Sequence, residues 1–444
     1  MKIKNVAFGI LLTALAISCS DDSSSDNPAP APTPEPEPLP LQDVCPESTT
    51  VVSDEPKICL LQGVYTQDLT LTADTTWVLS NGVFVGEDNA NSAVLTIEPG
   101  TKIIGQSGAD FLVINRGSKI MAAGTAEAPI VFTSAKEPGS RSRGDWGGLI
   151  INGNAPINGC DTGVCVAEGE GNTGVYGGDN PEDNSGMLKY VRIEFAGNEI
   201  SPDNELNGIA FQGIGSGTVV DYIQVHYNAD DGVEFFGGTV NAKHIVLTGN
   251  RDDSLDWVNG WNGTAQYILV DQADDQANNG IEGDNLKQNM DIAPRSNPTL
   301  VNMTFVGTQG EAAKGGHGIL LRRGTSAKIY NSVIANFKNA CIKIDDAATF
   351  ASDIQIYNTV LANCKEGATI AEEGDGFVTS DWFSAFAGNS IENALTTVDR
   401  LYSSQITDGQ ELPANDFIEK TSYRGAIESA EKDWTAGWTT SAAN

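Results

Sequence analysis

Three short acidic turns are the part of this sequence with the clearest capacity for chemistry. They read Asn228-Ala-Asp-Asp-Gly-Val-Glu234, Asn250-Arg-Asp-Asp-Ser-Leu-Asp256, and Ala273-Asp-Asp275 with Gly280-Ile-Glu282 closing the third. Carboxylates grouped in this way can bind a hard cation, share acid and base roles, or cap the amides of their own turns. The candidate site residues are Asp230, Asp231, Glu234, Asp252, Asp253, Asp256, Asp274 and Asp275.

If the turns are stacked in successive coils, equivalent positions lie ~4.8 Å apart and the carboxylates form columns. The expected columns are Asp230 over Asp252 over Asp274, Asp231 over Asp253 over Asp275, and Glu234 beside Asp256. Repulsion between two such neighbours is ~0.9 kcal/mol in water and ~3.5 kcal/mol at an effective dielectric of 20. One hypothesis is a stabilising Ca²⁺, which takes several oxygen ligands at flexible geometry. The alternative is a solvated acidic edge whose carboxylates splay apart and cap turn amides.

Carbohydrate chemistry is a second use for paired carboxylates, because glycoside hydrolysis needs one acid and one base. Asp230-Asp-Gly232 and Gly316-His-Gly318 resemble two motifs of the polygalacturonase family of β-helix hydrolases. The Arg-Ile-Lys motif of that family corresponds to Cys341-Ile-Lys343, which lacks the arginine. Stacking alone would separate His317 from the aspartates by on the order of 15–20 Å, too far for one active site.

Two tryptophans are candidate contacts for a sugar. Trp257 and Trp261 lie close together in Asp256-Trp-Val-Asn-Gly-Trp-Asn262 and could present rings to a sugar face. Packing in the core or at a corner of the fold is the alternative.

The acidic turns belong to a repeat. Short apolar strands precede them, and equivalent positions fall at Tyr222, His244 and Tyr267, in steps of 22 and 23 residues. Such a period is typical of a solenoid, in which each unit buries its apolar face against its neighbours. Three- to five-residue β-branched runs broken by Gly, Pro and Asp extend this pattern along the chain. The sequence therefore predicts an all-β parallel β-helix over residues 45–374, with an N-terminal cap.

Two near-copies extend the repeat toward the C-terminus. Tyr330-Asn-Ser-Val-Ile-Ala-Asn336 and Tyr357-Asn-Thr-Val-Leu-Ala-Asn363 predict short asparagine ladders, Asn331 under Asn358 and Asn336 under Asn363. The pattern fails after about residue 374. We expect residues 375–444 to form a mixed C-terminal capping region, because an open strand edge invites aggregation; a separate small domain is the alternative.

The N-terminus predicts export. Residues 1–19 combine Lys2 and Lys4 with an apolar run too short to span a bilayer, ending at Ala16-Ile-Ser-Cys19. This ending resembles the lipobox of bacterial lipoproteins, which implies cleavage before Cys19 and its lipidation; an ordinary signal peptide is the alternative. Residues 20–44 form a Ser/Pro-rich linker with alternating prolines. The expected location is the outer membrane or cell surface, with the lipid anchor as the only contact to the membrane.

The remaining cysteines form three neighbouring pairs in an exported chain, a pattern that favours disulfides. The pairs are Cys45 with Cys59, Cys160 with Cys165, and Cys341 with Cys364. The last two are 23 residues apart, one coil of the solenoid, and stacked free thiols are the alternative there. The net charge of −33 makes nucleic acid an improbable partner, because this surface repels phosphate.

Several longer motifs resemble a group of secreted Gram-negative lipoproteins with a pectate-lyase-like right-handed parallel β-helix. They are Gly144-Asp-Trp-Gly-Gly-Leu-Ile-Ile-Asn-Gly-Asn-Ala-Pro-Ile-Asn158, Tyr176-Gly-Gly178, Glu182-Asp-Asn-Ser-Gly186, Tyr190-Val-Arg-Ile-Glu-Phe-Ala-Gly197, Gly215-Ser-Gly-Thr218 and Glu234-Phe-Phe-Gly-Gly-Thr-Val-Asn-Ala-Lys-His244. The resemblance covers roughly residues 94 to 306 and implies a right-handed, single-stranded solenoid, but no common activity. The interpretation is a lipid-anchored surface protein that binds a polysaccharide or a surface protein, or has an adhesin-like structural role. The alternative is a calcium-dependent polysaccharide lyase or a glycoside hydrolase.

Overall fold

The computed structural model describes residues 45–201, 204–310, 316–364, 369–371, 379–392, 404–405 and 411–441. The predicted signal segment 1–19, Cys19 and the linker 20–44 lie outside the described residues. Within the described part of the chain, no helix is both long and apolar enough to cross a membrane.

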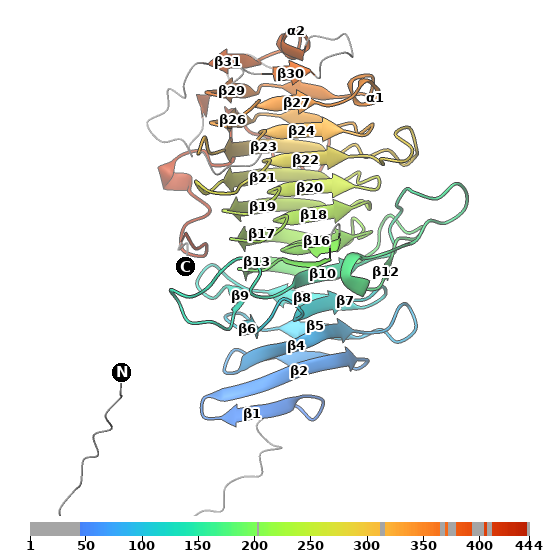
Figure 1. The fold of residues 1–444 in the computed structure, drawn as a ribbon, viewed down its shortest axis with the longest axis vertical. Helices are drawn as coiled ribbons and strands as arrows, with labels where there is room; N and C mark the ends of the chain where they lie inside the picture. Colours follow the sequence, from blue (N-terminus) through green and yellow to red (C-terminus); the bar gives the residue numbers. More distant parts are fainter. Residues whose placement is uncertain are drawn as a thin grey trace, which may run out of the picture. The chain divides into compact units, whose positions relative to one another are not determined.

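The chain winds as a right-handed parallel β-helix with three faces, and one coil follows another up the stack (Figure 1). This confirms the predicted fold class. Face 1 consists of β3 (Leu69–Leu71), β5 (Val94–Ile97), β8 (Lys119–Ala123), the first halves of β13 (Gly186–Glu194), β17 (Val219–His226), β19 (Asn241–Thr248), β21 (Thr264–Asp271) and β23 (Thr299–Val306), then β25 (Lys328–Tyr330) and β28 (Gln355–Tyr357).

Face 2 consists of β6 (Lys102–Gly105), β9 (Ile130–Ser134), the second halves of β13 to β23, then β26 (Val333–Ala335), β29 (Val360–Ala362) and β31 (Ser390–Glu392). Face 3 consists of β7 (Phe111–Ile114), β10 (Gly148–Asn152), β16 (Ile209–Gln212), β18 (Val233–Phe236), β20 (Leu255–Val258), β22 (Ile281–Asp284), β24 (Ile319–Arg322), β27 (Ile342–Ile344) and β30 (Thr369–Ala371). The long strand β4 (Thr76–Val85) pairs with β2 (Lys57–Tyr65) on one side and with β6 and β7 on the other.

The corner between faces 1 and 2 carries a column of residues with positive φ, which we call the corner column. Its members are Tyr190, Tyr222, His244, Tyr267, Asn302, Asn331 and Asn358, with φ between 51° and 62°. The aromatic rings stack with centroids 4.4 Å apart for Tyr190–Tyr222, 4.1 Å for Tyr222–His244 and 4.9 Å for His244–Tyr267. The predicted vertical register is therefore confirmed, and the stack helps to offset the left-handed conformation that these side chains disfavour.

Both asparagine ladders are also confirmed. Asn358 Nδ2 donates to Asn331 Oδ1 at 3.0 Å, and Asn363 Nδ2 donates to Asn336 Oδ1 at 3.0 Å. A primary amide both donates and accepts, so an identical residue one coil away satisfies it.

The core is a column of apolar side chains enclosed by the three faces, and it contains both tryptophans that are candidate sugar contacts in the sequence. Trp257 and Trp261 are fully buried, so the prediction of ligand contact is wrong. Trp257 Nε1 donates to Thr325 Oγ1 at 2.9 Å, and Trp261 stacks on Phe235 with centroids 3.9 Å apart. The inward direction follows from strand alternation, since Trp257 pairs in register with Phe235 and its ring fills the space beside Gly283.

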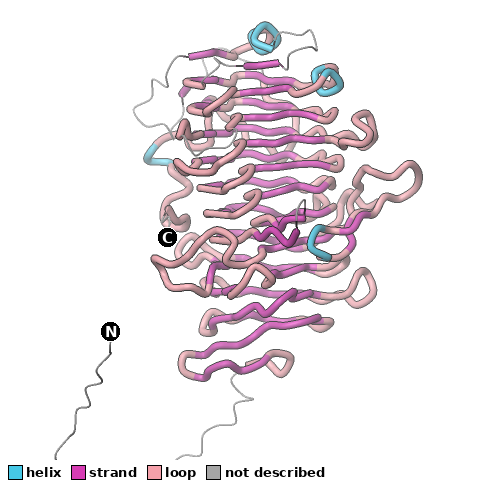
Figure 2. The backbone as a smooth tube through the Cα atoms, in the orientation of Figure 1, coloured by secondary structure: helices cyan, strands magenta, loops and turns pink. Residues whose placement is uncertain are grey.

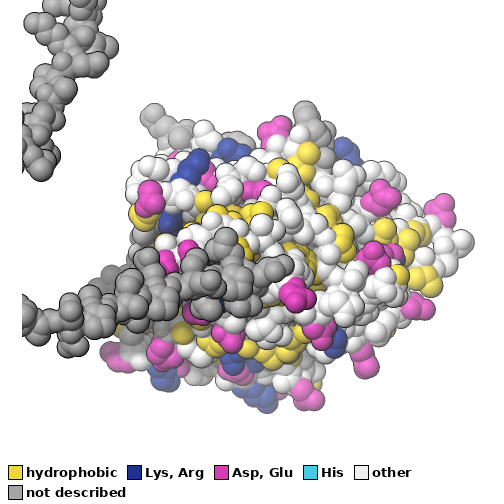
Figure 3. Space-filling view, turned by 90° about the horizontal axis from the view of Figure 1, so that it is seen from below, with side chains coloured by type: hydrophobic (Ala, Val, Ile, Leu, Met, Phe, Trp, Pro, Cys, Tyr) yellow, Lys and Arg dark blue, Asp and Glu magenta, His cyan; other side chains and the backbone are white. Residues whose placement is uncertain are grey.

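All three predicted disulfides are confirmed: Cys45–Cys59, Cys160–Cys165 and Cys341–Cys364. The first ties the chain to β2 near the N-terminal end of the stack, where β1 (Thr50–Asp54) pairs antiparallel with β2. Viewed from that end, acidic side chains are scattered around the rim and apolar ones show toward the middle (Figure 3).

The C-terminal residues 411–441, which we call the C-terminal strap, run along the side of the solenoid (Figures 1 and 2). Trp434 and Trp438 pack edge-on against Tyr222 of the corner column, with centroids 6.2 and 6.0 Å away. We expected residues 375–444 to cover the last coil. Of the described part, α2 (Thr379–Ser384) and β31 lie at the last coils, whereas the strap lies beside the stack, where it packs on the rings of the corner column and accepts from the side-chain amides of Gln266 and Asn302.

Smaller elements project from the stack or end it. They are β11 (Ala167–Glu168), η2 (Glu170–Asn172), β12 (Val175–Tyr176), β14 (Asn198–Ser201), β15 (Asn204–Leu206), α1 (Ala347–Phe350), α2 (Thr379–Ser384), β32 (Ser404–Gln405), β33 (Tyr423–Arg424) and η3 (Ala430–Lys432). The excursion that carries β11, η2 and β12 matters for function, because it faces the outer surface of face 3.

Candidate functional site

The acidic turns connect face 2 to face 3. They are held by a series of hydrogen bonds in which a side-chain oxygen of one coil accepts from a backbone amide of the next coil. Asp231 Oδ1 accepts from the amide of Asp253 at 2.9 Å, and Asp253 Oδ1 accepts from the amide of Asn279 at 2.7 Å. Asn279 Oδ1 in turn accepts from the amide of His317 at 3.1 Å. One oxygen of each aspartate is therefore used to hold the next coil, which is the amide-capping role expected under the alternative to calcium.

The predicted columns hold for two coils and are wrong for the third. Asn278 and Asn279, not Asp274 and Asp275, continue them: Asn278 Nδ2 donates to Asp252 Oδ1 at 2.8 Å. The reason is the longer turn after β21, which has nine residues between Asp271 and Ile281, against six between Thr248 and Leu255.

The two displaced aspartates take other partners. Asp274 Oδ1 accepts from Thr308 Oγ1 at 2.7 Å, and Asp275 pairs with Arg143 at 2.7 Å. Neither residue belongs to the acidic columns, so both leave the candidate metal site.

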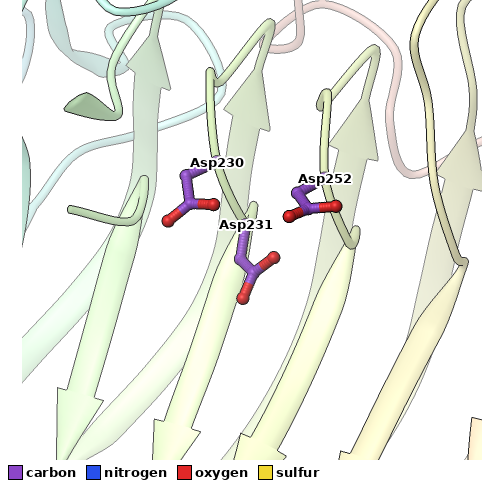
Figure 4. Close-up of side chains that lie close together, drawn as sticks. All are labelled: Asp230, Asp231 and Asp252. Carbon is purple, nitrogen blue, oxygen red and sulfur yellow. The ribbon is translucent and has the colours of Figure 1, made fainter. Parts of the chain in front are cut away.

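Three carboxylates lie close together on two adjacent acidic turns, those of Asp230, Asp231 and Asp252 (Figure 4). One oxygen of each lies within 4.8 Å of one oxygen of each of the others. Asp231, Asp253 and Asp256 form a second group with the same spacing. Burial, and then the neighbouring Asp252, raise the pKa of Asp230 to about 8. Burial and Asp252 likewise raise the pKa of Asp253 to about 7. The group therefore carries fewer charges at neutral pH than its sequence implies, unless a cation binds.

A cavity of about 350 Å³, which we call the groove, lies against the outer surface of face 3. It contains a carboxylate row in which Glu234, Asp256 and Glu282 are in register, one on each of three successive coils. The excursion that carries η2 closes one side with two further glutamates. The lining residues are Glu168, Gly169, Glu170, Tyr176, Gln212, Glu234, Phe236, Asp256, Val258, Asn259, Glu282, Asp284, Arg322 and Arg323.

Two arginines at the end of β24 neutralise one end of the groove. Arg322 bonds to Asp284 at 2.9 Å and also to Glu282, and Arg323 bonds to Asp284 at 2.6 Å. Even so, burial raises the pKa of Asp284 to about 7, against the lowering effect of Arg323. The arginine end is therefore close to charge balance.

At the other end, no ion pair to Glu170, Glu234 or Asp256 is formed by the residues that the structure describes. Burial, and then Asp231, raise the pKa of Glu234 well above its usual range, and burial followed by Glu234 does the same for Asp256. Burial and Glu205 raise the pKa of Glu170 to about 7. Glu234 accepts a hydrogen bond from Asn207 Nδ2 at 2.6 Å, so one of its oxygens is fixed.

His317 stands in the same column as Asp231 and Asp253, but three coils further along, a distance of roughly 14 Å at the spacing of stacked strands. Burial lowers its pKa to about 4. This separation is slightly shorter than the ~15–20 Å expected from the sequence, but it still keeps the polygalacturonase-like motifs from meeting in one site.

Sequence reasoning missed most of the groove. Glu282 belongs to the third acidic turn of the sequence. Asp284 follows it by two residues, so both side chains lie on the same face of one strand. Arg322 and Arg323 gave no signal until β24 was placed in register with β22. Glu168 and Glu170 sit in an irregular excursion between β10 and β13 that carries no repeat.

The comparisons with known proteins agree with the fold. A family model described as a pectate-lyase-like beta helix domain matches residues 63–439. No curated protein and no solved structure matches the chain.

Proposed function

This chain belongs to the family of pectate-lyase-like β-helix domains, and from that premise we propose that it is an exported, lipid-anchored surface protein that binds a polysaccharide segment in the groove. The signal-like residues 1–19 and Cys19 support export and anchoring at the outer membrane or cell surface. The membrane contact is the lipid anchor alone, and the acidic surface argues against nucleic acid.

The observation that carries this proposal is the groove itself. Glu234, Asp256 and Glu282 repeat along the axis at the ~4.8 Å rise of stacked strands, so acceptors of one kind are offered in a row. A row suits an extended chain of repeating units better than a compact ligand. Sugars are rich in hydroxyl donors, and carboxylates accept hydrogen bonds from them strongly.

The test is binding of soluble polysaccharides to the full chain by isothermal titration calorimetry, with a groove variant and a matched control. Glu234→Gln with Asp256→Asn removes two ionisable carboxyl groups from the groove and should weaken binding at least tenfold. Asp179→Asn with Glu182→Gln removes two charges from exposed positions and should leave binding unchanged. Equal affinity in the two variants would refute the groove as the binding site.

A second candidate function is glycoside hydrolysis, and a specific observation favours it. Burial, and then Asp231, raise the pKa of Glu234 well above its usual range, as a general acid needs, while Glu282 is paired with Arg322. These two residues are two coils apart, ~9.6 Å between backbones, near the ~6.5–9.5 Å between the carboxyl groups of inverting glycosidases. Glu234 would protonate the leaving oxygen and Glu282 would activate a water molecule.

Hydrolysis is distinguished from binding by the release of reducing ends. If the groove is catalytic, the wild-type chain releases them and Glu282→Gln slows release at least a hundredfold while binding persists. A calcium-dependent lyase is less well supported, because its arginine base must be free and both Arg322 and Arg323 are paired with carboxylates.

We also propose that Ca²⁺ binds the group formed by Asp230, Asp231 and Asp252. Calcium lies ~2.3–2.6 Å from its oxygen ligands, so ligands on opposite sides of one ion are roughly 5 Å apart. The 4.8 Å limit on the three carboxylate oxygens fits that size. A calcium site predicts a melting temperature that rises in millimolar CaCl₂ and falls back with EGTA; an unchanged melting temperature argues for the solvated acidic edge.

A further inference from the structure

The groove has two electrically different ends. Six carboxylates line it against two guanidinium groups. Within the described residues, the ion pairs of the groove are made to Glu282 and Asp284, and none is made to Glu234 or Asp256. The carboxyl groups without an ion pair are therefore grouped where Glu234, Asp256 and the nearby Glu170 lie.

These carboxylates do not converge on one point. The groups with three carboxylate oxygens within 4.8 Å, among the described residues, lie at the acidic turns and include only Asp256 of the groove. Glu234, Asp256 and Glu282 are instead spread along the axis, one per coil. A single metal ion does not satisfy a row, whereas several positive groups on one extended molecule do.

A separate observation points to a ligand with donor groups. Gln212 is 98% buried, lines the groove, and its Oε1 has no hydrogen-bond partner among the described residues. Gln212 stands one coil before Phe236 in the register of face 3, next to Glu234. An orphaned buried acceptor costs free energy comparable to a lost hydrogen bond. A ligand N–H or O–H reaching this wall would satisfy it.

We infer that the groove selects an amino-sugar oligosaccharide, with ammonium groups against Glu170, Glu234 and Asp256 and with hydroxyl oxygens toward Arg322 and Arg323. The inference rests on the proposed binding function and specifies its substrate class. Ammonium groups complement the unpaired carboxylates, and the sugar hydroxyls complement both the carboxylates and the guanidinium donors.

The same charge distribution excludes acidic polysaccharides. A polyuronate would place a carboxylate on every sugar against this row, and like charges brought together at an interface cost several kcal/mol. Specificity then comes from repulsion of the acidic polymer as well as attraction of the basic one. Burial raises the pKa values of Glu234 and Asp256, so an ammonium group that pairs with either carboxyl group displaces its proton.

The experiment is calorimetric titration of the full chain at about pH 7 and low salt with four probes of similar length. They are a glucosamine tetramer, its N-acetylated counterpart, a galacturonate tetramer, and spermine as an amine without a sugar. We expect the glucosamine tetramer to bind at least tenfold more tightly than the other three, and its affinity to fall with added NaCl.

The groove variants separate this inference from the proposed function. Glu234→Gln and Asp256→Asn, each confirmed as folded by circular dichroism, should weaken the glucosamine tetramer at least tenfold, whereas exposed Asp179→Asn should not. If the N-acetylated or galacturonate tetramer binds more tightly and the same variants weaken it, the groove still binds saccharide but the amino-sugar inference is overturned. Spermine binding as tightly as the sugar also overturns it. If no saccharide responds to the variants, both proposals fail.

Discussion

The corner column and the acidic turns are two stacks in the same solenoid, with the same vertical spacing and opposite energetics. In the corner column, aromatic rings stack with centroids 4.1–4.9 Å apart and Asn358 donates to Asn331, so neighbours of the same kind attract one another. In the acidic turns, Asp230 meets Asp252 and Asp231 meets Asp253, and like charge faces like charge. In a stack of identical residues, the attraction or repulsion between two neighbours is repeated at every coil.

The interaction energies indicate that the corner column stabilises the fold and that the acidic turns destabilise it. An aromatic pair contributes about 0.5–1.5 kcal/mol beyond area burial, whereas two carboxylates one coil apart repel by ~3.5 kcal/mol at an effective dielectric of 20. Backbone amides recover part of this cost, since Asp231 and Asp253 each accept one. A bound cation would relieve the repulsion that the backbone amides do not offset. We therefore expect function at the acidic turns and in the groove.

The largest expected effect is the pH dependence of stability in EGTA. The folded-state pKa is about 8 for Asp230 and about 7 for Asp253 and Asp284, against ~3.9 in unfolded chains. The folded state therefore holds protons that the unfolded state releases, and stability is lost as pH rises from ~4 through ~8. The loss should reach several kcal/mol, measured as a falling melting temperature from pH 5 to pH 8.

Calcium supplies the control for this profile. If Ca²⁺ binds the acidic turns, it replaces the protons and the decline becomes shallower in CaCl₂. A melting temperature that stays level or rises between pH 5 and pH 8 in EGTA would show that the carboxylates of the acidic turns do not destabilise the fold.

A charge placed in the corner column should have the next largest effect. Asn331 is 1% exposed, accepts from Asn358 Nδ2 at 3.0 Å and donates to Thr421 Oγ1 at 3.1 Å. Asn331→Asp keeps the shape and tolerates positive φ, but it removes the donor and buries a carboxylate. We expect a loss of ~2–3 kcal/mol by denaturant unfolding.

Asn363→Asp is the matched control, because Asn363 makes the same kind of ladder bond to Asn336 at 3.0 Å from an exposed position. There the charge stays hydrated, and the loss should remain below ~1 kcal/mol. Equal losses at the two sites would mean that burial does not decide the cost of charge in a ladder.

The difference between the two stacks also explains what the sequence could predict. Tyr222, His244 and Tyr267 repeat at nearly constant spacing, so their register followed from counting residues. Asn331 and Asn358 followed for the same reason. Periodicity converts position along the chain into position along the axis whenever the coil length is constant.

The same counting fails where a coil changes length. Three extra residues after β21 moved Asp274 and Asp275 out of the acidic columns and left Asn278 and Asn279 in their place. The groove was predicted even less well, because Glu170 comes from an irregular excursion and Arg322 comes from a strand four coils beyond β16. Tertiary contacts of that kind leave no period in the sequence.

The smallest expected effect comes from removing one charge from the acidic turns. Asp230→Asn in EGTA should stabilise the chain by ~1–2 kcal/mol, because the partly exposed side chain no longer repels Asp252 and solvent screens part of the original cost. In CaCl₂ the sign should reverse, since the variant loses one of the three carboxylates that lie within 4.8 Å of one another. Stability is compared by thermal melts of wild type and variant at pH 8 in both buffers. If the variant is more stable than wild type in both buffers, repulsion between carboxylates still explains the result, but Asp230 is excluded as a calcium ligand. If the variant is less stable in both buffers, Asp230 stabilises the fold by bonds to its own turn.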